Sequence, residues 1–261
     1  MSSSTNLNYA LVTGASSGIG WHISEQLAQR GYNLIVVSNQ KSGLQELKQH
    51  LESNYQIDVK CIDIDLSETN SARYLFDYCK ENNLEVEVLV NNAGNLVLGE
   101  VSNLKILESQ NTMQLHMNTP VLLCQLLGKE MIKNGMGFIL NVSSISAVMP
   151  YPVISLYGPT KSFLRQFTKA FRTEMKASNV VVTCLMPGAT DTALLDTHNL
   201  NLPIAKSLGV IGKSEWVARS GLKALFKNRA ECIPGILNKL IVLFVPLVPR
   251  FVIELIYRKF Y

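Results

Sequence analysis

The sequence predicts an α/β fold in which a doubly wound parallel sheet is covered by helices on both faces. Short apolar runs of β-prone residues recur along the chain, and amphipathic stretches with helical spacing separate them. Because the runs show little polar alternation, each strand should be buried on both faces, as in parallel sheets. Repeated β–α units with short connections are typical of doubly wound folds with right-handed crossovers.

The pattern places the elements by residue. The six predicted strands are Tyr9–Thr13, Asn33–Val37, Val59–Ile64, Val86–Val90, Phe138–Val142 and Val180–Met186. The clearest helical patterns are Ile19–Gln29 and Leu44–Leu51, each with one apolar face. Because no repeat, linker or low-complexity segment divides the chain, residues 1–261 are predicted to form one domain.

Composition bounds the class of protein. With 261 residues, 47% hydrophobic and 17% charged, the chain can bury a large core without disulfides, and a disordered or fibrous protein is excluded. The net charge of +4 is too small to imply a nucleic-acid partner. The five cysteines are scattered and lie outside any His/Cys cluster, which favours reduced thiols and predicts no metal site. The first residues lack the features of a signal peptide, so a cytoplasmic location is expected.

The C-terminal segment 236–261 is unusual because it is both apolar and basic. From residue 219 to the end there are eight Lys or Arg and only two Glu. Its longest charge-free run, Leu240–Pro249, is about half of what a membrane-spanning helix needs. The segment is predicted to be a helical extension that packs on the core or on a second subunit. A peripheral contact with a membrane is the main alternative, and a spanning helix is the least favoured.

A glycine-rich turn directly follows the first predicted strand. Glycines at positions 14, 18 and 20 give the pattern G-x-x-x-G-x-G, with Ser16, Ser17 and Ile19 between them. Gly14 permits the tight turn, Gly18 lets a pyrophosphate approach the backbone, and Gly20 lets the next helix pack against the sheet. The N–H groups at that helix start would face the anion. A glycine-rich turn between a strand and a helix can also occur without a ligand, but the pattern favours a Rossmann-like dinucleotide site.

Two further loops lie where a dinucleotide would extend. Asp65 and Leu66 end the third strand, where a carboxylate can accept the adenine amino group, although a solvated strand end gives the same pattern. Asn91, Ala93 and Gly94 follow the fourth strand, where small residues permit a close approach to the ribose. A tight turn is the alternative interpretation of that loop.

Tyr157 and Lys161 are four residues apart and so share one face of a predicted helix. A free tyrosine has a pKa near 10 and exchanges protons poorly at pH 7. A fixed cation beside it would lower the pKa of the phenol and make it a general acid or base. Because this spacing is common by chance, a surface pair is the alternative for these two residues taken alone.

Other polar residues gather at the same edge of the predicted sheet. Ser144 follows the fifth strand and can donate a hydrogen bond to a carbonyl oxygen. The loop after the sixth strand contains Pro187, Gly188, Thr190 and Thr192. Since open α/β sheets bind ligands at the carboxyl ends of their strands, these loops predict one active site.

Together, the segments TGASSGIG, NNAG, Ser144 with Tyr157-x-x-x-Lys161, and PGATDT resemble the single-domain short-chain dehydrogenase/reductase family over about residues 7–230. The resemblance implies an NAD(P)-dependent oxidoreductase in which Tyr157 is the general acid/base and Ser144 polarises the carbonyl. It also implies that Lys161 lowers the pKa of Tyr157 and binds the nicotinamide ribose, and that Asn118 holds a water of the proton relay. The implied cofactor-binding set is Gly14, Ser16, Ser17, Gly18, Ile19, Gly20, Ser38, Asn39, Asp65, Leu66, Asn91, Ala93, Gly94, Tyr157, Lys161, Pro187, Gly188, Thr190 and Thr192.

Two segments indicate which cofactor and which class of substrate the chain binds. Ser38 stands at the position where an acidic residue would favour NAD, so NADP is expected rather than NAD. The arginine that is common at the next position and binds the 2′-phosphate is absent, because Asn39 stands there. Residues 193–212 are apolar with almost no charge, which favours a lipid-like or steroid-like carbonyl substrate. Two alternatives stay open: a dinucleotide-binding regulator without turnover, and a sugar epimerase or dehydratase. By family habit the chain is expected to be a homo-oligomer.

Overall fold

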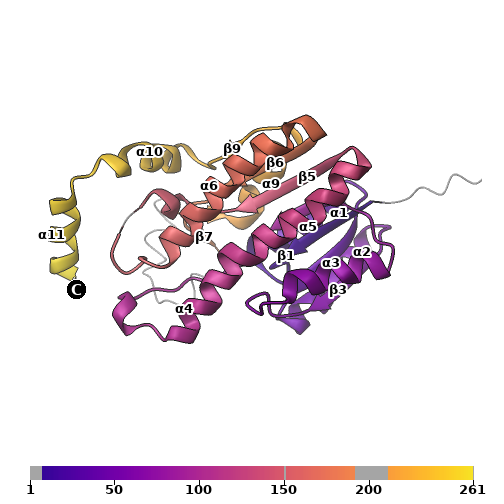
Figure 1. Cartoon of the computed structure of the whole chain (residues 1–261), viewed down its shortest axis with the longest axis horizontal. Coiled ribbons are helices and arrows are strands. Elements are labelled where there is room, and N and C mark those ends of the chain that lie inside the picture. Colours follow the sequence, from indigo (N-terminus) through magenta and orange to yellow (C-terminus); the bar gives the residue numbers. More distant parts are fainter. Residues whose placement is uncertain (1–7, 150, 192–210, 261) are drawn as a thin grey trace, which may run out of the picture.

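The computed structural model describes residues 8–149, 151–191 and 211–260, which include one seven-stranded parallel sheet (Figure 1). Its strands are β1 (Tyr9–Thr13), β2 (Asn33–Ser38), β3 (Val59–Asp63), β4 (Val86–Asn91), β5 (Gly137–Val142), β6 (Val180–Leu185) and β9 (Glu231–Cys232). Their order is β3-β2-β1-β4-β5-β6-β9, and all pairs are parallel. The predicted doubly wound α/β fold is therefore confirmed.

The strand order reverses at β1, which pairs with β2 on one side and with β4 on the other. Leu11 of β1 lies opposite both Ile35 of β2 and Leu89 of β4. Beyond this point the connections run outward in opposite directions, so the loops after β1 and β4 part and leave a crevice at the carboxyl edge. The topology thus fixes where a ligand can enter.

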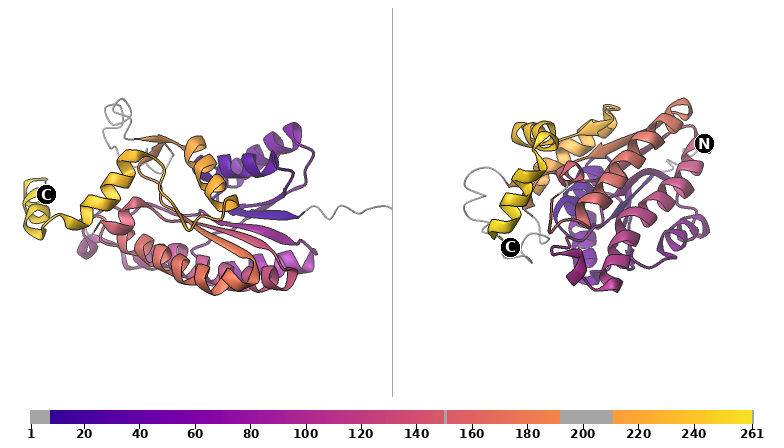
Figure 2. Two further views of the ribbon diagram at one scale, coloured as in Figure 1. Left: turned by 90° about the horizontal axis from the view of Figure 1, so that it is seen from above. Right: turned by 60° about the vertical axis from the view of Figure 1, so that its left-hand side comes forward.

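Helices cover both faces of the sheet (Figure 2). One face carries α1 (Gly18–Ala28), α2 (Lys41–Asn54) and α9 (Ser214–Phe226), and the other carries α3 (Ser71–Glu81), α5 (Thr119–Asn134) and α6 (Tyr157–Met175). Successive strand residues face opposite layers: Val12 packs with the α1 side and Leu11 with the α3 side. Both are fully buried, which explains the continuous apolar runs in the sequence.

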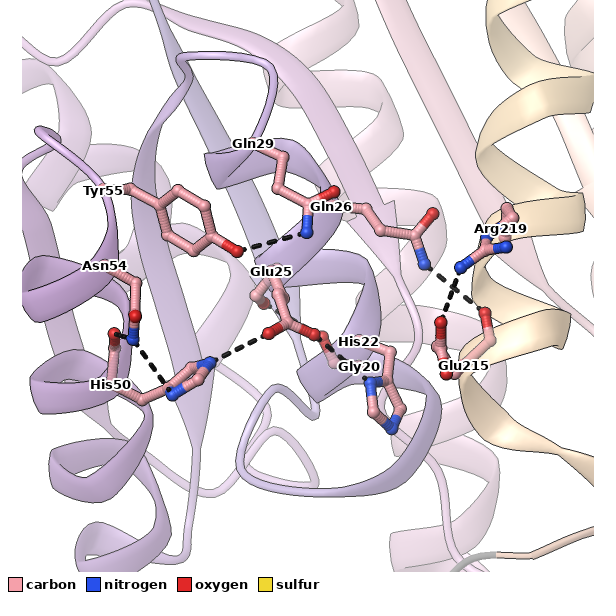
Figure 3. A network of polar contacts seen from close by, with 11 residues as sticks. Gly20, His22, Glu25, Gln26, Gln29, His50, Asn54, Tyr55, Glu215 and Arg219 are labelled. Carbon is pink, nitrogen blue, oxygen red and sulfur yellow. Dashed lines mark hydrogen bonds and ion pairs between the residues drawn. The ribbon is translucent and has the colours of Figure 1, made fainter.

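Polar contacts link the outer surfaces of α1, α2 and α9 (Figure 3). Glu25 of α1 accepts from His50 of α2 at 2.9 Å and pairs with His22 at 3.5 Å. Gln26 of α1 donates to the backbone oxygen of Glu215 in α9 at 3.4 Å. These contacts are made by side chains that point away from the sheet. They link the helices to one another at a distance from the carboxyl edge of the sheet.

Three short strands were not predicted. β9 pairs with β6, with Glu231 opposite Cys184 and Cys232 opposite Leu185, and Arg165 of α6 bonds Glu231 at 2.7 Å. β7 (Thr190–Asp191) and β8 (Gly212–Lys213) form a separate two-stranded ladder. A two-residue strand has no detectable periodicity, because long-range pairing rather than local pattern forms it.

The C-terminal segment forms α10 (Ile236–Phe244), the turn η5 (Val245–Leu247) and α11 (Arg250–Phe260), at one end of the molecule (Figure 1). In the described part of the chain no single helix has the length and hydropathy of a membrane span; only the pair 236–247 and 250–259, bent by 105°, passes that test. Val242 packs on a small cluster with Cys184 and Met186. The predicted helical extension is therefore present and touches the core through α10.

Candidate active site

A cleft of about 630 Å³ opens at the carboxyl edge of the sheet, where β1 and β4 part. It is lined by Gly14, Ser16, Ser17, Gly18, Ile19, Ser38, Asn39, Gln40, Ile64, Asp65, Leu66, Asn92, Ala93, Gly94, Asn95, Leu96, Leu115, Val142, Ser143, Ser144, Ile145, Tyr157, Lys161, Pro187, Gly188, Ala189 and Thr190. Most of the predicted site residues are therefore brought together in one place. Of the described residues in the predicted set, Asn91, Asn118 and Gly20 are not among the lining residues.

The glycine turn forms the floor of the cleft at the start of α1. Gly14 and Gly18 have φ of +64° and +56°, conformations that a side chain would strain. No side chain caps the N-terminus of α1, whose N-cap residue is Ser17, so its first N–H groups are left for a ligand. Gly20 is buried instead, and a Cβ there would lie 2.1 Å from the oxygen of Gly14, so Gly20 permits close packing rather than ligand contact.

The loop after β4 is fastened to the glycine turn. Thr13 Oγ1 accepts from the backbone N–H groups of Asn92 and Ala93 at 2.9 and 3.0 Å. The Asn92 amide donates to the oxygens of Thr13 and Gly14, each at 3.0 Å. The prediction for Asn91 was misplaced by one residue: its side chain points into the core and donates to Asn141 at 2.8 Å. Strand alternation sends neighbouring side chains to opposite sides, and Asn92 is the one that meets the cleft.

Hydroxyl and amide groups line the end of the cleft beside β2. Ser16 Oγ lies 2.9 Å from Ser38 Oγ, which also accepts from the Gln40 N–H at 3.2 Å. Asn39 is exposed beside them. Of the described lining residues only Asp65 is acidic, and its carboxylate accepts from the N–H and hydroxyl of Ser67 at 2.9 and 2.8 Å. Apart from Asp65, this end of the cleft therefore offers uncharged hydroxyl and amide groups.

Tyr157, Ser144 and Lys161 meet at the other end of the cleft. Ser144 follows β5, forms a hydrogen bond with the Tyr157 phenol, and accepts from the Ser146 N–H at 3.1 Å. Tyr157 and Lys161 lie one helical turn apart on α6, with the Lys161 Nζ 5.8 Å from the centre of the Tyr157 ring. Lys161 is 4% exposed and donates to the oxygen of Val142 at 3.2 Å. The arrangement offers a phenol, a hydroxyl and an ammonium to one bound carbonyl compound.

The expectation that Lys161 lowers the pKa of Tyr157 is not what this structure shows. Burial raises the pKa of the Tyr157 phenol, and the hydrogen bond with Ser144 partly opposes the rise. Lys161 is itself desolvated, and burial lowers the pKa of its ammonium to about 8. The Lys161 ammonium is directed to the Val142 oxygen, so it stabilises a Tyr157 phenolate weakly. Here burial has a larger effect than the neighbouring charge.

The prediction for Asn118 is wrong. Asn118 is exposed, and its amide donates to Gln114 at 2.9 Å. Residues Gln114–Asn118 form a π-helical turn, η2, between α4 (Ile106–Met113) and α5. On this turn it is His116, fully buried, that contacts a site residue: its ring meets that of Tyr157 edge to face at 5.7 Å, although His116 does not itself line the cleft. A π turn has a different angular spacing from an α-helix, so the chain pattern alone did not show which residue faces inward.

The loop after β6 closes the cleft opposite the glycine turn. Pro187, Gly188 and Thr190 line it, and Thr190 donates to the Gly188 oxygen at 2.9 Å. A Cβ on Gly188 would lie 2.4 Å from the Asn238 Oδ1 of α10, so the extension packs directly behind this loop. Thr192, and residues 193–210 of the expected apolar lid, lie outside the described residues.

These residues fit a pyridine dinucleotide. The uncapped start of α1 suits a pyrophosphate, and the bare backbone at Gly94 lies near Lys161, since a Cβ on Gly94 would be 3.3 Å from its Nζ. The uncharged Ser38 and Asn39 suit an adenosine ribose, and Tyr157 and Ser144 lie at the opposite end. The cleft therefore has the chemistry for a cofactor that runs across the switch in strand order.

Comparisons with known proteins agree with this geometry. The sequence model of the short chain dehydrogenase family matches residues 8–202. The human 17-beta-hydroxysteroid dehydrogenase type 3 is 33% identical over 199 residues, which cover 74% of this chain and 63% of that protein. Very-long-chain 3-oxoacyl-CoA reductase from Kluyveromyces lactis is 31% identical over 227 residues, covering 84% and 64%. The chain thus matches less than two thirds of the length of either relative.

Solved structures share the fold. A short-chain dehydrogenase from Sphingobium yanoikuyae in complex with NADPH superimposes with a TM-score of 0.81, at 24% identity, over 88% of this chain and 89% of that one. A 7beta-hydroxysteroid dehydrogenase superimposes with a TM-score of 0.83, at 21% identity, over 91% of each chain. Since the family model covers well over half of the sequence, this chain belongs to the short-chain dehydrogenase family.

Proposed function

We propose that this chain is an NADPH-dependent reductase of a hydrophobic, lipid-like or steroid-like carbonyl compound. In the reaction a ketone, NADPH and a proton give a secondary alcohol and NADP⁺. The observation that carries the proposal is the convergence of Tyr157, Ser144 and Lys161 on a cleft that begins at the uncapped start of α1. Their chemistry matches the polarisation and protonation of a carbonyl oxygen.

The protein residues have separate tasks in this proposal. Ser144 donates to the substrate oxygen, where negative charge develops, and Tyr157 gives that oxygen its proton. Lys161 returns a proton toward Tyr157 and holds the cofactor ribose. Bound nicotinamide supplies the hydride, and the loops at Gly14, Gly94 and Gly188 orient it. The carbonyl carbon thus receives the hydride, and the carbonyl oxygen receives the proton from Tyr157.

Preference for NADPH over NADH is supported by the cleft end beside β2. An acidic side chain there would bind the free 2′-hydroxyl of NADH and repel a 2′-phosphate, but Ser38 and Asn39 are neutral. The hydroxyls of Ser16 and Ser38, 2.9 Å apart, can donate to a phosphate. Measuring KM for NADPH and for NADH tests this choice, and a clear preference for NADH overturns it.

A hydrophobic substrate is supported by the apolar side chains at the Tyr157 end and by the relatives. Leu96, Leu115 and Ile145 line the cleft there. The names of the two relatives given above refer to a hydroxysteroid and to a very-long-chain 3-oxoacyl-CoA. Because an apolar pocket gains affinity with each buried methylene, catalytic efficiency should rise with substrate size.

The test is NADPH oxidation with ketones graded by chain length and ring count. Efficiency should increase along both series with the intact chain and fall by about 10²–10⁴-fold in Tyr157→Phe. The variant should keep its affinity for NADPH, which separates lost chemistry from lost binding. Tyr55→Phe, a change of the same kind at a half-buried tyrosine after α2 that does not line the cleft, is the matched control. If Tyr157→Phe has no effect on any function of the protein, the alternative of a non-catalytic dinucleotide-binding regulator is favoured.

We also propose that the C-terminal helices contact an anionic lipid surface. The large apolar side chains that α10, η5 and α11 expose are Ile236, Leu237, Leu240, Leu243, Phe244, Leu247, Phe251 and Leu255. On α10 they recur with helical spacing on the outer side, whereas Asn238 and Val242 face the core. Basic side chains at Lys239, Arg250 and Arg258 lie on the same helices and complement acidic headgroups. This contact would place the cleft, through Gly188, beside a source of apolar substrate.

Co-sedimentation with vesicles tests the contact. The intact chain should bind vesicles containing phosphatidylserine better than pure phosphatidylcholine, and salt should weaken binding. Phe244→Ser with Phe251→Ser should reduce binding, as should removal of residues 236–261, while Tyr74→Ser on α3, 52% exposed, should not. Failure of the intact chain to bind either vesicle overturns the proposal. Resistance of bound protein to alkaline extraction overturns it in favour of insertion.

We also propose that the chain forms a homo-oligomer and is located in the cytoplasm, in peripheral contact with a membrane. A homo-oligomer is supported by exposed apolar side chains on the outer helices, at Leu122 and Ile132 of α5 and Phe163 of α6. Light scattering after gel filtration measures the mass, and a monomer at micromolar concentration contradicts it. A cytoplasmic location with peripheral membrane contact is tested by fractionating cells that express the tagged chain.

A further inference from the structure

His116 is a buried histidine whose two ring nitrogens both have partners. The backbone N–H of Asn95, in the loop after β4, donates to its Nε2 at 3.1 Å. Its Nδ1 lies 2.9 Å from the Thr160 hydroxyl of α6. The ring thus bridges the loop after β4 and helix α6, both of which line the cleft, because Asn95 follows Gly94 and Thr160 lies between Tyr157 and Lys161.

These contacts fix the protonation of the ring. Because Nε2 accepts from an N–H that can only donate, it carries no proton, and the single proton of the neutral ring lies on Nδ1. Nδ1–H therefore donates to Thr160 Oγ1, and the Thr160 hydroxyl in turn donates to the Tyr157 backbone oxygen at 2.8 Å. Donation runs in one direction, from Asn95 through His116 and Thr160 to Tyr157.

The surroundings also require the ring to be neutral. Lys161 of α6 is the charged group that acts on His116, and burial together with this charge holds the pKa of His116 well below its usual range. Tyr157, on the same helix, meets the ring edge to face. On the side of the β4 loop, a Cβ on Gly94 would lie 3.0 Å from Nε2, so backbone alone packs there. A second proton would break the Asn95 contact and place like charges together.

We propose that His116 is a positioning residue for the proposed reduction: its Nδ1 side holds Tyr157 in register with Ser144, and its Nε2 side holds the cofactor-binding loop at Gly94–Asn95. This rests on the proposed function, but it adds a role that the acid–base groups do not supply. His116 acts through Thr160 and Asn95 and transfers no proton. Misplacement of a reacting group by about 1 Å can lower the rate about 10²-fold, so the effect of removing the His116 side chain should be measurable.

Two substitutions divide the two halves of this bridge. The amide of Asn reaches about as far as Nδ1, and that of Gln about as far as Nε2. His116→Asn should keep the contact with Thr160, and His116→Gln should keep that with Asn95. We expect His116→Leu to lower kcat about 10- to 100-fold and to raise KM for NADPH. His116→Asn should recover most of kcat, whereas His116→Gln should recover KM for NADPH.

Thr160 supplies an independent test should His116→Leu fail to fold. Thr160→Val keeps the shape of the side chain but lacks the hydroxyl, and it should lower kcat with little change in KM for NADPH. Thr160→Ser restores the hydroxyl and should restore kcat. His50→Asn is the control on the outer face of α2, where His50 contacts Glu25 (Figure 3). Thermal melting of each variant shows whether a loss of kcat follows from unfolding.

The outcomes are distinguishable from failure of the proposed function. If the wild-type chain turns over no ketone, NADPH affinity of the Asn and Gln variants and the tautomer of His116, read by nitrogen NMR, still test the bridge. A proton on Nε2 in the folded chain overturns the inference. So does wild-type kcat in His116→Leu, or equal loss of kcat in Thr160→Ser and Thr160→Val.

Discussion

Lys161 holds its ammonium 5.8 Å from the centre of the Tyr157 ring and bonds it to the backbone oxygen of Val142. Both side chains are desolvated, so the pKa of Tyr157 is raised and that of Lys161 is lowered to about 8. Because of these two shifts, the phenol of Tyr157 holds its proton more tightly than the amine of Lys161 does, which reverses the order of the free side chains. A group whose pKa lies near the working pH exchanges protons readily, and in this site that group is Lys161.

The buried ammonium of Lys161 should lower the free energy of unfolding, and replacing Lys161 by an uncharged residue should raise it. Its folded pKa of about 8 lies below the reference value of 10.5, so the charged form is disfavoured by folding. Stability rises with pH between these values, because the unfolded chain there binds more protons. Lys161→Met should therefore raise the free energy of unfolding at pH 7 by on the order of 2–3 kcal/mol and abolish turnover. Chemical denaturation at pH 7 and pH 10.5 measures this. A difference between variant and wild type that is equal at both pH values would contradict it.

Acid should destabilise the protein partly through His116. Its pKa in the fold lies well below 6.5, so its contribution is fully present above about 6.5 and is lost as the pH falls toward the folded value. His116→Gln has no titrating ring, and its unfolding free energy should fall less steeply between pH 6.5 and 4.5. Lys161 and Tyr157 face the ring and do not change charge in that range. Parallel pH profiles for the two proteins would rule this out.

Cofactor preference should follow residue 38. Ser38→Asp places a carboxylate at the end of β2, beside Ser16. It should raise KM for NADPH at least about tenfold by repelling the 2′-phosphate and should lower KM for NADH. Ser38→Asn is the neutral control of the same size. Steady-state kinetics with both cofactors measure the switch, and an unchanged KM ratio in Ser38→Asp shows that the phosphate binds elsewhere.

Gly20 should be indispensable for packing α1. A Cβ at Gly20 would lie 2.1 Å from the Gly14 oxygen, so Gly20→Ala must displace the turn. We expect a loss of about 1–3 kcal/mol in unfolding free energy, together with weaker NADPH binding. Gly212→Ala is the control, because the nearest atom to its Cβ would be at 3.5 Å, an ordinary contact. Equal thermal midpoints for Gly20→Ala and the wild type would contradict the packing role.

Local sequence was sufficient for the strands, the glycine turn, and the pairing of Tyr157 with Lys161 on one helical face. Each of these depends on a short-range regularity: a buried apolar run, a positive φ at Gly14 or Gly18, or a spacing of four residues on a helix. Parallel strands then bring the loops to one edge by topology alone. The six main strands, and the gathering of Ser144, Tyr157 and Lys161, therefore agree with the expectation.

Packing decided what the chain pattern left open. His116 rather than Asn118 packs against Tyr157 because a π turn changes the angular spacing. Asn92 rather than Asn91 meets the cleft because the strand carries Asn91 into the core. Neither fact has a local signature. The pKa values of Tyr157 and Lys161 follow from desolvation, which depends on every neighbour that excludes water. Sequence determined which groups meet, and tertiary structure decided their orientation and their charge.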